Sequence, residues 1–101
     1  MRDKRRYILV ESSCEVAEAD RERFSSGLYS GLLQCIGEAN YHRVNPRVMD
    51  FVGSRRFIIR SMLDGCGLTV AALAMIKKVN GDDVYFYTLK CSGTMKALGA
   101  V

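Results

Sequence analysis

The sequence predicts an α+β domain of the ferredoxin-like class, with two helices on one face of a four-stranded antiparallel sheet. Two observations carry this prediction. Four short segments are rich in β-branched and aromatic residues, whereas two longer segments place apolar residues at helical spacing. Along the chain these segments follow the order β-α-β-β-α-β, the signature of the split βαβ arrangement. With 101 residues, the chain is expected to form a single domain over residues 1–101.

The first strand and the first helix are expected in the N-terminal third. Residues 6–13 should form the strand, because its centre, Tyr7 to Val10, is apolar throughout. The helix should begin near Asp20, since apolar residues repeat at every fourth position after it. They form one core stripe: Phe24, Leu28, Leu32 and Ile36.

Two glycines, Gly27 and Gly31, lie inside this first helix at the same spacing. Each should cost about 1 kcal/mol relative to alanine in a helix interior. They indicate either a weak, solvent-facing helix or a flat helix face that another backbone approaches closely. We favour the close approach, because glycines stacked on one face would otherwise only destabilise the helix.

The middle of the chain is expected to contain two strands. Asn45-Pro46 marks a loop, because proline restricts the residue before it to extended conformations. Strands are expected over residues 47–52 and 55–62, with a turn at Gly53-Ser54 between them.

The last third predicts a helix, a tight turn and a strand. Asp64 can cap the start of the helix by accepting hydrogen bonds from backbone N–H groups. Its apolar stripe is expected to contain Leu68, Ala72, Met75 or Ile76, and Val79. Asn80-Gly81 should stop the helix, because glycine tolerates the left-handed conformation there. The last strand is expected over residues 84–91, with a short helical turn from Thr94 onward.

One face of this sheet should remain uncovered by helices. Alternation along the third strand directs Phe57 and Ile59 toward the helices, and Arg56, Ile58 and Arg60 outward. The first strand is apolar on both faces, and the fourth carries three aromatic residues in succession. A large apolar face usually marks an interaction site. We favour a partner there; the alternative is that tail residues or the connection after the first strand fold over it.

Composition indicates a folded, moderately basic chain. Hydrophobic residues make up 49%, which is enough for a core, and no apolar run reaches the length of a membrane span. No signal peptide is recognisable, so a cytoplasmic protein is expected. The net charge is +4, and arginines crowd the start and the middle of the chain. Arginine suits bidentate phosphate contacts and stacking on bases.

No residue pattern points to catalysis or to metal binding. The one histidine, His42, lacks a motif partner and is expected in a surface loop, and Asp82-Asp83 is interpreted as turn chemistry. No Cys-x-x-Cys spacing occurs among the four cysteines, so a zinc site is not expected. They are Cys14, Cys35, Cys66 and Cys91. Their even number allows two disulfides, but a cytosolic setting favours free thiols.

Basic residues on or beside strands are the candidates for nucleic-acid contact. The expected ferredoxin-like fold is also RRM-like, because RNA-recognition modules (RRMs) adopt it. An RRM stacks bases on aromatic residues of its central strands. Tyr7 and Phe57 lie on comparable strands, but the full RNP1 pattern is absent and both are expected in the core. Sequence-independent phosphate contact is therefore favoured. Its RNA-binding candidates are Arg5, Arg6, Arg55, Arg56, Arg60, Lys90 and Lys96. Lys77 and Lys78 are weaker candidates, because a helix C-terminus already explains them.

Several segments, in this order, resemble the archaeal ribonuclease P protein component 2 family. Arg5-Arg6-Tyr7-Ile8 matches the family's N-terminal strand, and Gly53 to Arg60 resembles its central strand of mixed basic and apolar residues. The family's Ala-Leu-rich helix, Ile/Val-Asn-Gly turn and Ser-Gly-Thr-Ile-Lys string are matched by residues 71–76, 79–81 and 92–96. Met95 stands where the family commonly has isoleucine, and residues 39–53 match less clearly.

The resemblance implies a non-catalytic subunit of ribonuclease P, the enzyme that removes the 5′ leader of precursor tRNA. In the archaeal enzyme the RNA subunit carries catalysis with Mg²⁺, and the protein binds no cofactor itself. Component 2 pairs with component 3, a TIM-barrel-like subunit, and both assist the catalytic domain of the RNA. The implied partners are ribonuclease P RNA, component 3 and, through the holoenzyme, precursor tRNA, with a heterotetramer as one form of the assembly.

An alternative is a small regulatory or ligand-binding ferredoxin-like domain that acts through dimerisation. It explains the fold and the apolar sheet, but neither the arginine distribution nor the string from Ser92 to Lys96. A small hydrolase of the same fold is a third and weaker hypothesis, because no anion-binding catalytic loop is evident.

Overall fold

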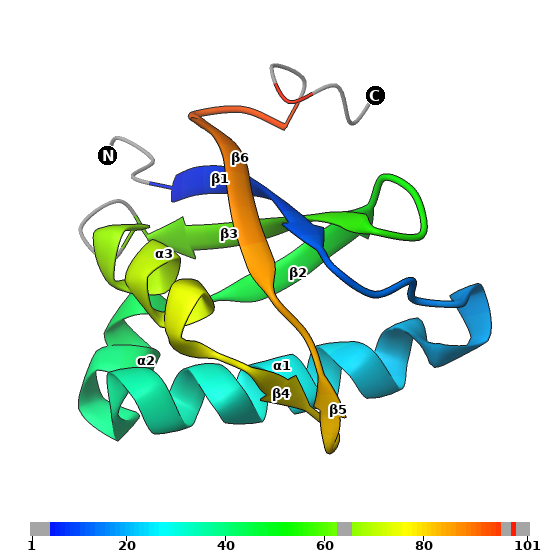
Figure 1. Ribbon diagram of the computed structural model, residues 1–101. Helices are drawn as coiled ribbons and strands as arrows, with labels where there is room; N and C mark the ends of the chain where they lie inside the picture. Colours follow the sequence, from blue (N-terminus) through cyan, green and yellow to red (C-terminus); the bar gives the residue numbers. More distant parts are fainter. Residues whose placement is uncertain (1–4, 63–65, 96–97, 99–101) are drawn as a thin grey trace.

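The computed structural model describes residues 5–62, 66–95 and 98 (Figure 1). Its elements in chain order are β1 (Arg5–Ser12), the 3-10 turn η1 (Glu18–Asp20), α1 (Arg21–Ile36), α2 (Glu38–Val44), β2 (Arg47–Phe51), β3 (Arg56–Met62), α3 (Cys66–Met75), β4 (Lys78–Val79), β5 (Asp82–Asp83) and β6 (Phe86–Ser92). The expected cap Asp64 lies outside the described residues.

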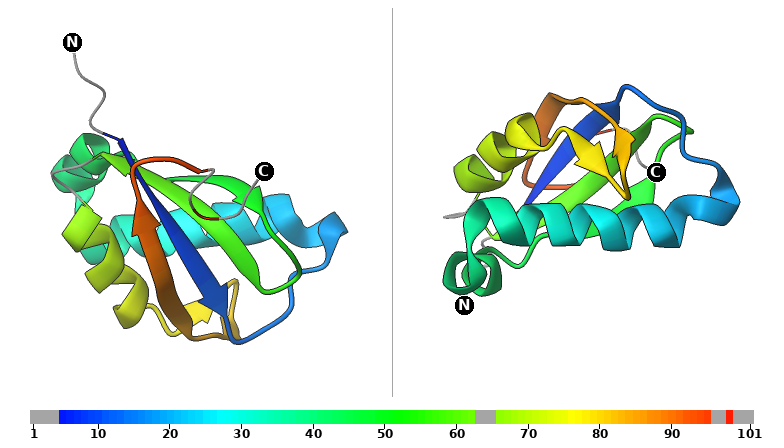
Figure 2. Two further views of the ribbon diagram at one scale, coloured as in Figure 1. Left: turned by 90° about the horizontal axis from the view of Figure 1, so that it is seen from above. Right: turned by 60° about the horizontal axis from the view of Figure 1, so that its bottom comes forward.

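β1 lies inside a four-stranded sheet of order β2-β3-β1-β6. It pairs antiparallel with β3, where Ile8 lies opposite Ile59, and antiparallel with β6, where Ile8 lies opposite Cys91. β2 pairs antiparallel with β3 at one edge. Helices α1 and α3 lie on the same face of the sheet (Figures 1 and 2). The predicted ferredoxin-like α+β fold is therefore confirmed.

The main core lies between the sheet and these two helices. The fourfold stripe of α1 is buried as predicted: Phe24, Leu28, Leu32 and Ile36. Phe57 and Ile59 of β3 are also buried and face this stripe. The ring of Phe24 meets the rings of Phe57 and Phe86 edge to face, with centroids 5.7 and 6.1 Å apart. These aromatic contacts connect α1 to β3 and β6.

The second long helix ends earlier than the sequence predicts. α3 stops at Met75, and the chain then forms the short hairpin β4–β5. Asn80 and Gly81 both have positive φ, at 55° and 86°, and form the turn of this hairpin instead of ending a helix. Asn-Gly is the preferred pair for such a two-residue turn as well as for a helix end, so the sequence signal is ambiguous. Asp82-Asp83 belongs to β5, not to the turn.

The face that α3 turns to the sheet also differs from the prediction. Ala72 and Leu73 are buried, whereas Leu68 and Met75, both expected in the core, are 39% and 66% exposed. Ile76, the alternative to Met75, is buried beyond the end of the helix. Val79 is buried as expected, although it belongs to β4.

A short helix, α2, occupies a segment that was expected to be a loop, so His42 lies on a helix. Gly37, with φ 89°, separates α1 from α2, and Asn45, with φ 48°, ends α2. Only Val44 of this helix is buried, so it lacks the apolar stripe that reveals longer helices. The last strand begins at Phe86, two residues later than expected.

Candidate nucleic-acid interface

The face of the sheet opposite α1 and α3, here called the open face, is defined by the strand register. Ile8, Val10, Phe57 and Ile59 belong to the core, so their strand neighbours point the other way. The register then places Tyr7 opposite Arg60, Leu9 opposite Ile58 and Glu11 opposite Arg56 on the open face. β6 adds Lys90, opposite Leu9, and Tyr87, opposite Glu11. The outward direction predicted for Arg56, Ile58 and Arg60 is confirmed.

Four of the seven predicted RNA-binding residues share this open face. Arg5 lies on β1 two residues before Tyr7, so it points to the same face, and it lies opposite Met62. Arg56, Arg60 and Lys90 lie on the central and edge strands beside it. Glu11 lies among these cations, and the Nε atom of Arg56 donates to its Oε1 atom at 3.0 Å. The open face is therefore basic, with Glu11 partly neutralising it, and the register places a second carboxylate, Asp50 of β2, opposite Ile58.

The remaining three candidates do not join this group. Arg6 lies opposite Ser61, whose hydroxyl is 3.3 Å from that of Thr69 on α3, so Arg6 belongs to the helix side. Arg55 precedes β3, and its guanidinium lies 3.9 Å from Glu15. Lys96 lies outside the described residues. Adjacent strand residues point to opposite faces, which is why Arg5 and Arg6 separate.

The centre of the open face is covered. Ile58 is fully buried although it lies outside the core cluster, and Leu98, beyond the end of β6, is only 6% exposed. The described chain that follows β6, residues 93–95, runs on the side of the sheet opposite α1 (Figures 1 and 2). The burial of Ile58 on a face without helices favours the alternative in which other parts of this chain fold over the sheet. Tyr7, expected in the core, instead lies half-buried on this face, whereas Phe57 is in the core as expected.

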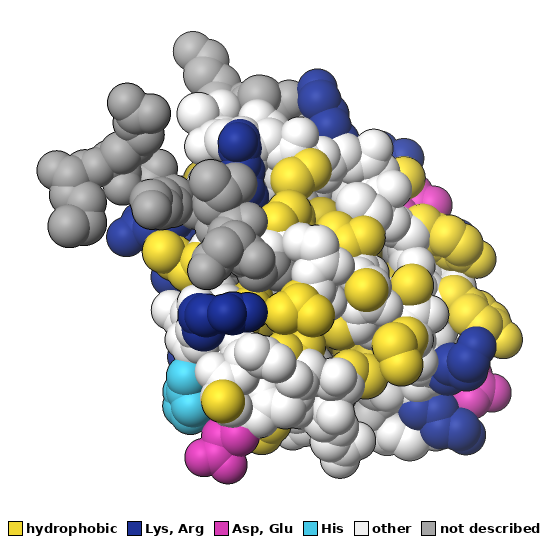
Figure 3. Space-filling model, turned by 90° about the vertical axis from the view of Figure 1, so that its left-hand side faces the viewer, with side chains coloured by type: hydrophobic (Ala, Val, Ile, Leu, Met, Phe, Trp, Pro, Cys, Tyr) yellow, Lys and Arg dark blue, Asp and Glu magenta, His cyan; other side chains and the backbone are white. Residues whose placement is uncertain are grey.

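A second surface, the outer face of α3, is apolar and exposed. Leu68, Ala71 and Met75 follow helical spacing and are all exposed. Figure 3 shows the side of the molecule on which α3 lies, with apolar side chains gathered across it. Sequence reasoning missed this surface because α3 is apolar on nearly all sides, so spacing alone could not show which residues face the core.

Lys77 and Lys78, expected at a helix end, lie beside the β4–β5 hairpin. The Nζ atom of Lys78 is 3.1 Å from Oδ1 of Asp83, and that of Lys77 lies 5.9 Å from the centre of the Tyr85 ring. The helix explanation for them is therefore wrong, although both still have structural contacts.

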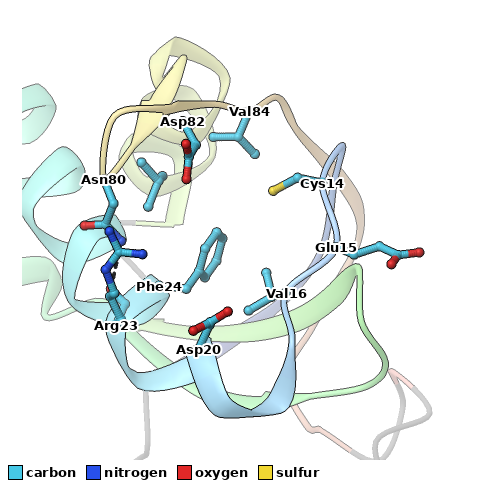
Figure 4. Close-up of a pocket in the computed structure, with 10 residues that line it drawn as sticks. Cys14, Glu15, Val16, Asp20, Arg23, Phe24, Asn80, Asp82 and Val84 are labelled. Carbon is cyan, nitrogen blue, oxygen red and sulfur yellow. Dashed lines mark hydrogen bonds between the residues drawn. The ribbon is translucent and has the colours of Figure 1, made fainter.

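A hollow of about 100 Å³ lies between the start of α1 and this hairpin (Figure 4). Asp20 and Arg23 line it from one side, and Asn80 and Asp82 from the other, with Cys14 at its far wall. Small-molecule sites usually enclose roughly 300–1,000 Å³. The size of this hollow therefore gives little support to a ligand-binding role.

Over residues 5–62, 66–95 and 98, no group of three or more His, Cys, Asp or Glu side chains could hold a metal ion. Within the same ranges, no helix combines the length and apolar character needed to cross a bilayer.

Comparison with known proteins adds two matches. The family model described as "Rpp14/Pop5 family" matches residues 6–100. A chain in a cryo-EM structure of yeast ribonuclease MRP matches with a TM-score of 0.62 and 9% sequence identity, covering 94% of this chain and 78% of that chain. At this identity the structural likeness supports the fold alone. No curated protein sequence matches.

Proposed function

The chain belongs to the Rpp14/Pop5 family of ribonuclease P protein subunits, and we propose that it assists the RNA subunit in removing the 5′ leader of precursor tRNA. The family match carries this proposal, because it spans residues 6–100 of these 101 residues. Within the family we assign it to the archaeal component 2 type, on the segments that resemble that type. Its role is to stabilise the catalytic domain of the RNA, without catalysing cleavage itself.

The open face is the RNA contact in this proposal. Arg5, Arg56, Arg60 and Lys90 surround a centre in which Ile58 is already buried. Bases therefore have little room to stack at the centre, whereas phosphates can approach the surrounding cations. Such contacts hold an RNA backbone in position without reading its sequence. Arg6, Arg55 and Lys96 remain candidates for contacts outside this face.

The outer face of α3 is the protein contact. Leu68, Ala71 and Met75 expose an apolar strip that carries no charge. Phosphate groups gain nothing from such a surface, whereas the apolar surface of a protein partner does. We assign it to component 3, the TIM-barrel-like subunit, in an assembly that can extend to a heterotetramer. We place this assembly in the cytoplasm and its Mg²⁺ with the RNA, whose phosphate oxygens are the hard ligands that Mg²⁺ prefers.

Affinity purification of the tagged chain from its native extract tests this function. We expect ribonuclease P RNA, identified by sequencing, and component 3, identified by mass spectrometry, to copurify. The charged variant Met75→Asp should lose component 3, while Lys78→Asp, on the hairpin, should keep both partners. A chain that purifies as a homodimer without this RNA would instead support the regulatory-domain alternative.

A further inference from the structure

Two cysteines from distant parts of the sequence meet in the fold. The sulfur atoms of Cys66 and Cys91 lie 3.4 Å apart, within the distance of a thiol hydrogen bond. Cys66 is the first residue of α3, and Cys91 lies on β6 opposite Ile8, on the sheet face that carries the helices. A disulfide has a sulfur–sulfur distance of about 2.05 Å, so about 1.4 Å of approach would close the bond. Small side-chain rotations can supply this movement.

The surroundings of the two thiols differ in a way that suits stepwise oxidation. Cys91 is exposed, whereas Cys66 is partly covered. Burial is the largest of the factors that raise the pKa of Cys66 from 9.0 to about 11; the hydrogen bond and the charge interaction with Cys91 also raise it, and Arg6 lowers it. At neutral pH Cys66 is thus held as a thiol beside an accessible neighbour.

We propose that Cys66 and Cys91 form a reversible dithiol–disulfide site that responds to peroxides. The Cys91 thiolate attacks one oxygen of hydrogen peroxide, the O–O bond breaks, and with one proton a sulfenic acid and water result. The Cys66 sulfur then attacks the Cys91 sulfur; its proton leaves with the sulfenic hydroxyl as a second water. Two thiols lose two electrons in total, and one peroxide gains them. Reduction by a dithiol restores both cysteines.

The disulfide would join the start of α3 to the edge strand β6. The closed loop contains α3 and the β4–β5 hairpin, and cross-linking a loop of this kind restricts the unfolded chain. The oxidised protein should therefore melt at a higher temperature than the reduced protein. Cys14, beside the hollow near the hairpin, and Cys35, on α1, supply internal controls for accessibility.

The test uses the full chain and hydrogen peroxide. The variant Cys14→Ser/Cys35→Ser keeps only the pair, and Cys66→Ser/Cys91→Ser keeps only the controls. After peroxide treatment and alkylation, the mass of the first variant should be lower by two hydrogen atoms, with no alkyl group on either cysteine of the pair. Peptide mapping should give a peptide linked between Cys66 and Cys91. The oxidised variant should also melt at a higher temperature. Dithiothreitol should reverse these changes. The second variant should form no link within the chain.

Three results would overturn the proposal. In the wild type, both thiols of the pair could stay alkylatable while Cys35 is oxidised. The pair could form links only between chains. The pair could also pass to sulfinic acids that dithiothreitol does not reduce. If either variant fails to fold, peptide mapping of the peroxide-treated wild type still shows whether Cys66 and Cys91 become linked to each other.

Discussion

Asn80 occupies the space that a side chain at Gly27 would need. A Cβ atom on Gly27 would lie 2.6 Å from the Oδ1 atom of Asn80, closer than real Cβ contacts. The Nδ2 atom of Asn80 donates to the backbone oxygen of Arg23 at 3.1 Å, which fixes the hairpin against α1. A Cβ atom on Gly31 would likewise lie 3.2 Å from Ile76. The close approach favoured from the sequence is real, but side chains make it, not a backbone.

Replacing Gly27 by alanine should destabilise the protein. The new Cβ must displace the side chain of Asn80 and break its bond to Arg23; overpacking costs about 1–3 kcal/mol, which exceeds the gain of up to about 1 kcal/mol from the better helix propensity of alanine. Urea denaturation measures the loss. Gly67, also helical but with nothing within 4 Å of its Cβ position, is the matched control, and Gly67→Ala should stabilise by up to about 1 kcal/mol. Adding Asn80→Gly should recover part of the loss; an unaltered Gly27→Ala protein would refute the contact.

Alanine substitutions at core and at surface positions that looked alike in the sequence should change the free energy of unfolding by different amounts. Leu32→Ala or Phe57→Ala should each cost roughly 2–5 kcal/mol, because both side chains are fully buried. Met75→Ala, at a position 66% exposed, should change the free energy of unfolding by less than about 0.5 kcal/mol. Equal losses at Phe57 and Met75 would mean that α3 packs in the orientation expected from its spacing.

Stability should decline in alkaline solution through Cys66. Burial, and then its contact with Cys91, raises the pKa of this thiol from 9.0 to about 11. Above pH 9 the unfolded chain loses this proton while the folded chain retains it, so stability falls as the pH rises to about 11. Denaturation midpoints of the reduced protein between these values measure the fall. Cys66→Ser should decline less steeply; parallel curves would exclude this linkage.

The features predicted correctly from the sequence are those in which apolar residues recur at one clear spacing. The stripe from Phe24 to Ile36 and the alternation from Arg56 to Arg60 each have one interpretation, and both were correct. α3 has apolar residues on most sides, so spacing could not distinguish the buried Leu73 from the exposed Leu68. Asn80-Gly81 fits a helix end and a hairpin turn equally well, and only the packing on Gly27 shows which one forms.

The basic surface was predictable only in part. Alternation alone could have separated Arg5 from Arg6, because neighbours on a strand point to opposite faces. The pairing of Arg56 with Glu11 depends on strand register, which no local pattern revealed. The burial of Ile58 and of Leu98 depends on contacts that no local pattern reveals, so it required the folded chain.

Loss of a cation from the open face should weaken RNA binding whatever the RNA sequence. Arg60→Ala and Lys90→Ala should each reduce affinity and lower the salt dependence by about one counterion. The experiment is a salt titration of RNA binding by the chain assembled with its protein partner. Lys78→Ala, which removes a cation from the hairpin, is the matched control and should leave the slope unchanged. If Arg60→Ala and Lys90→Ala both keep the wild-type slope, the RNA binds elsewhere.

Removing the carboxylate of Glu11 from the open face should have the opposite effect. Glu11→Gln eliminates the charge that pairs with Arg56 at 3.0 Å, so Arg56 becomes available to a phosphate. Affinity for RNA should rise, and more strongly at low salt, where charge interactions are less screened. Glu38→Gln, on α2, is the comparison, because it changes the net charge equally and lies outside the sheet. Equal gains from both variants would indicate a general charge effect.

Reconstituted cleavage of precursor tRNA tests the central claim most directly. Ribonuclease P RNA, component 3 and Mg²⁺ are combined with the wild-type chain, with an Arg56→Ala/Arg60→Ala/Lys90→Ala variant, or with no chain, and release of the 5′ leader is measured. We predict rapid release with the wild-type chain, slower release with the variant or without the chain, and none from the chain freed of RNA. Leader release by the RNA-free chain, or the same rate with and without it, would contradict the assignment of a non-catalytic, assisting subunit.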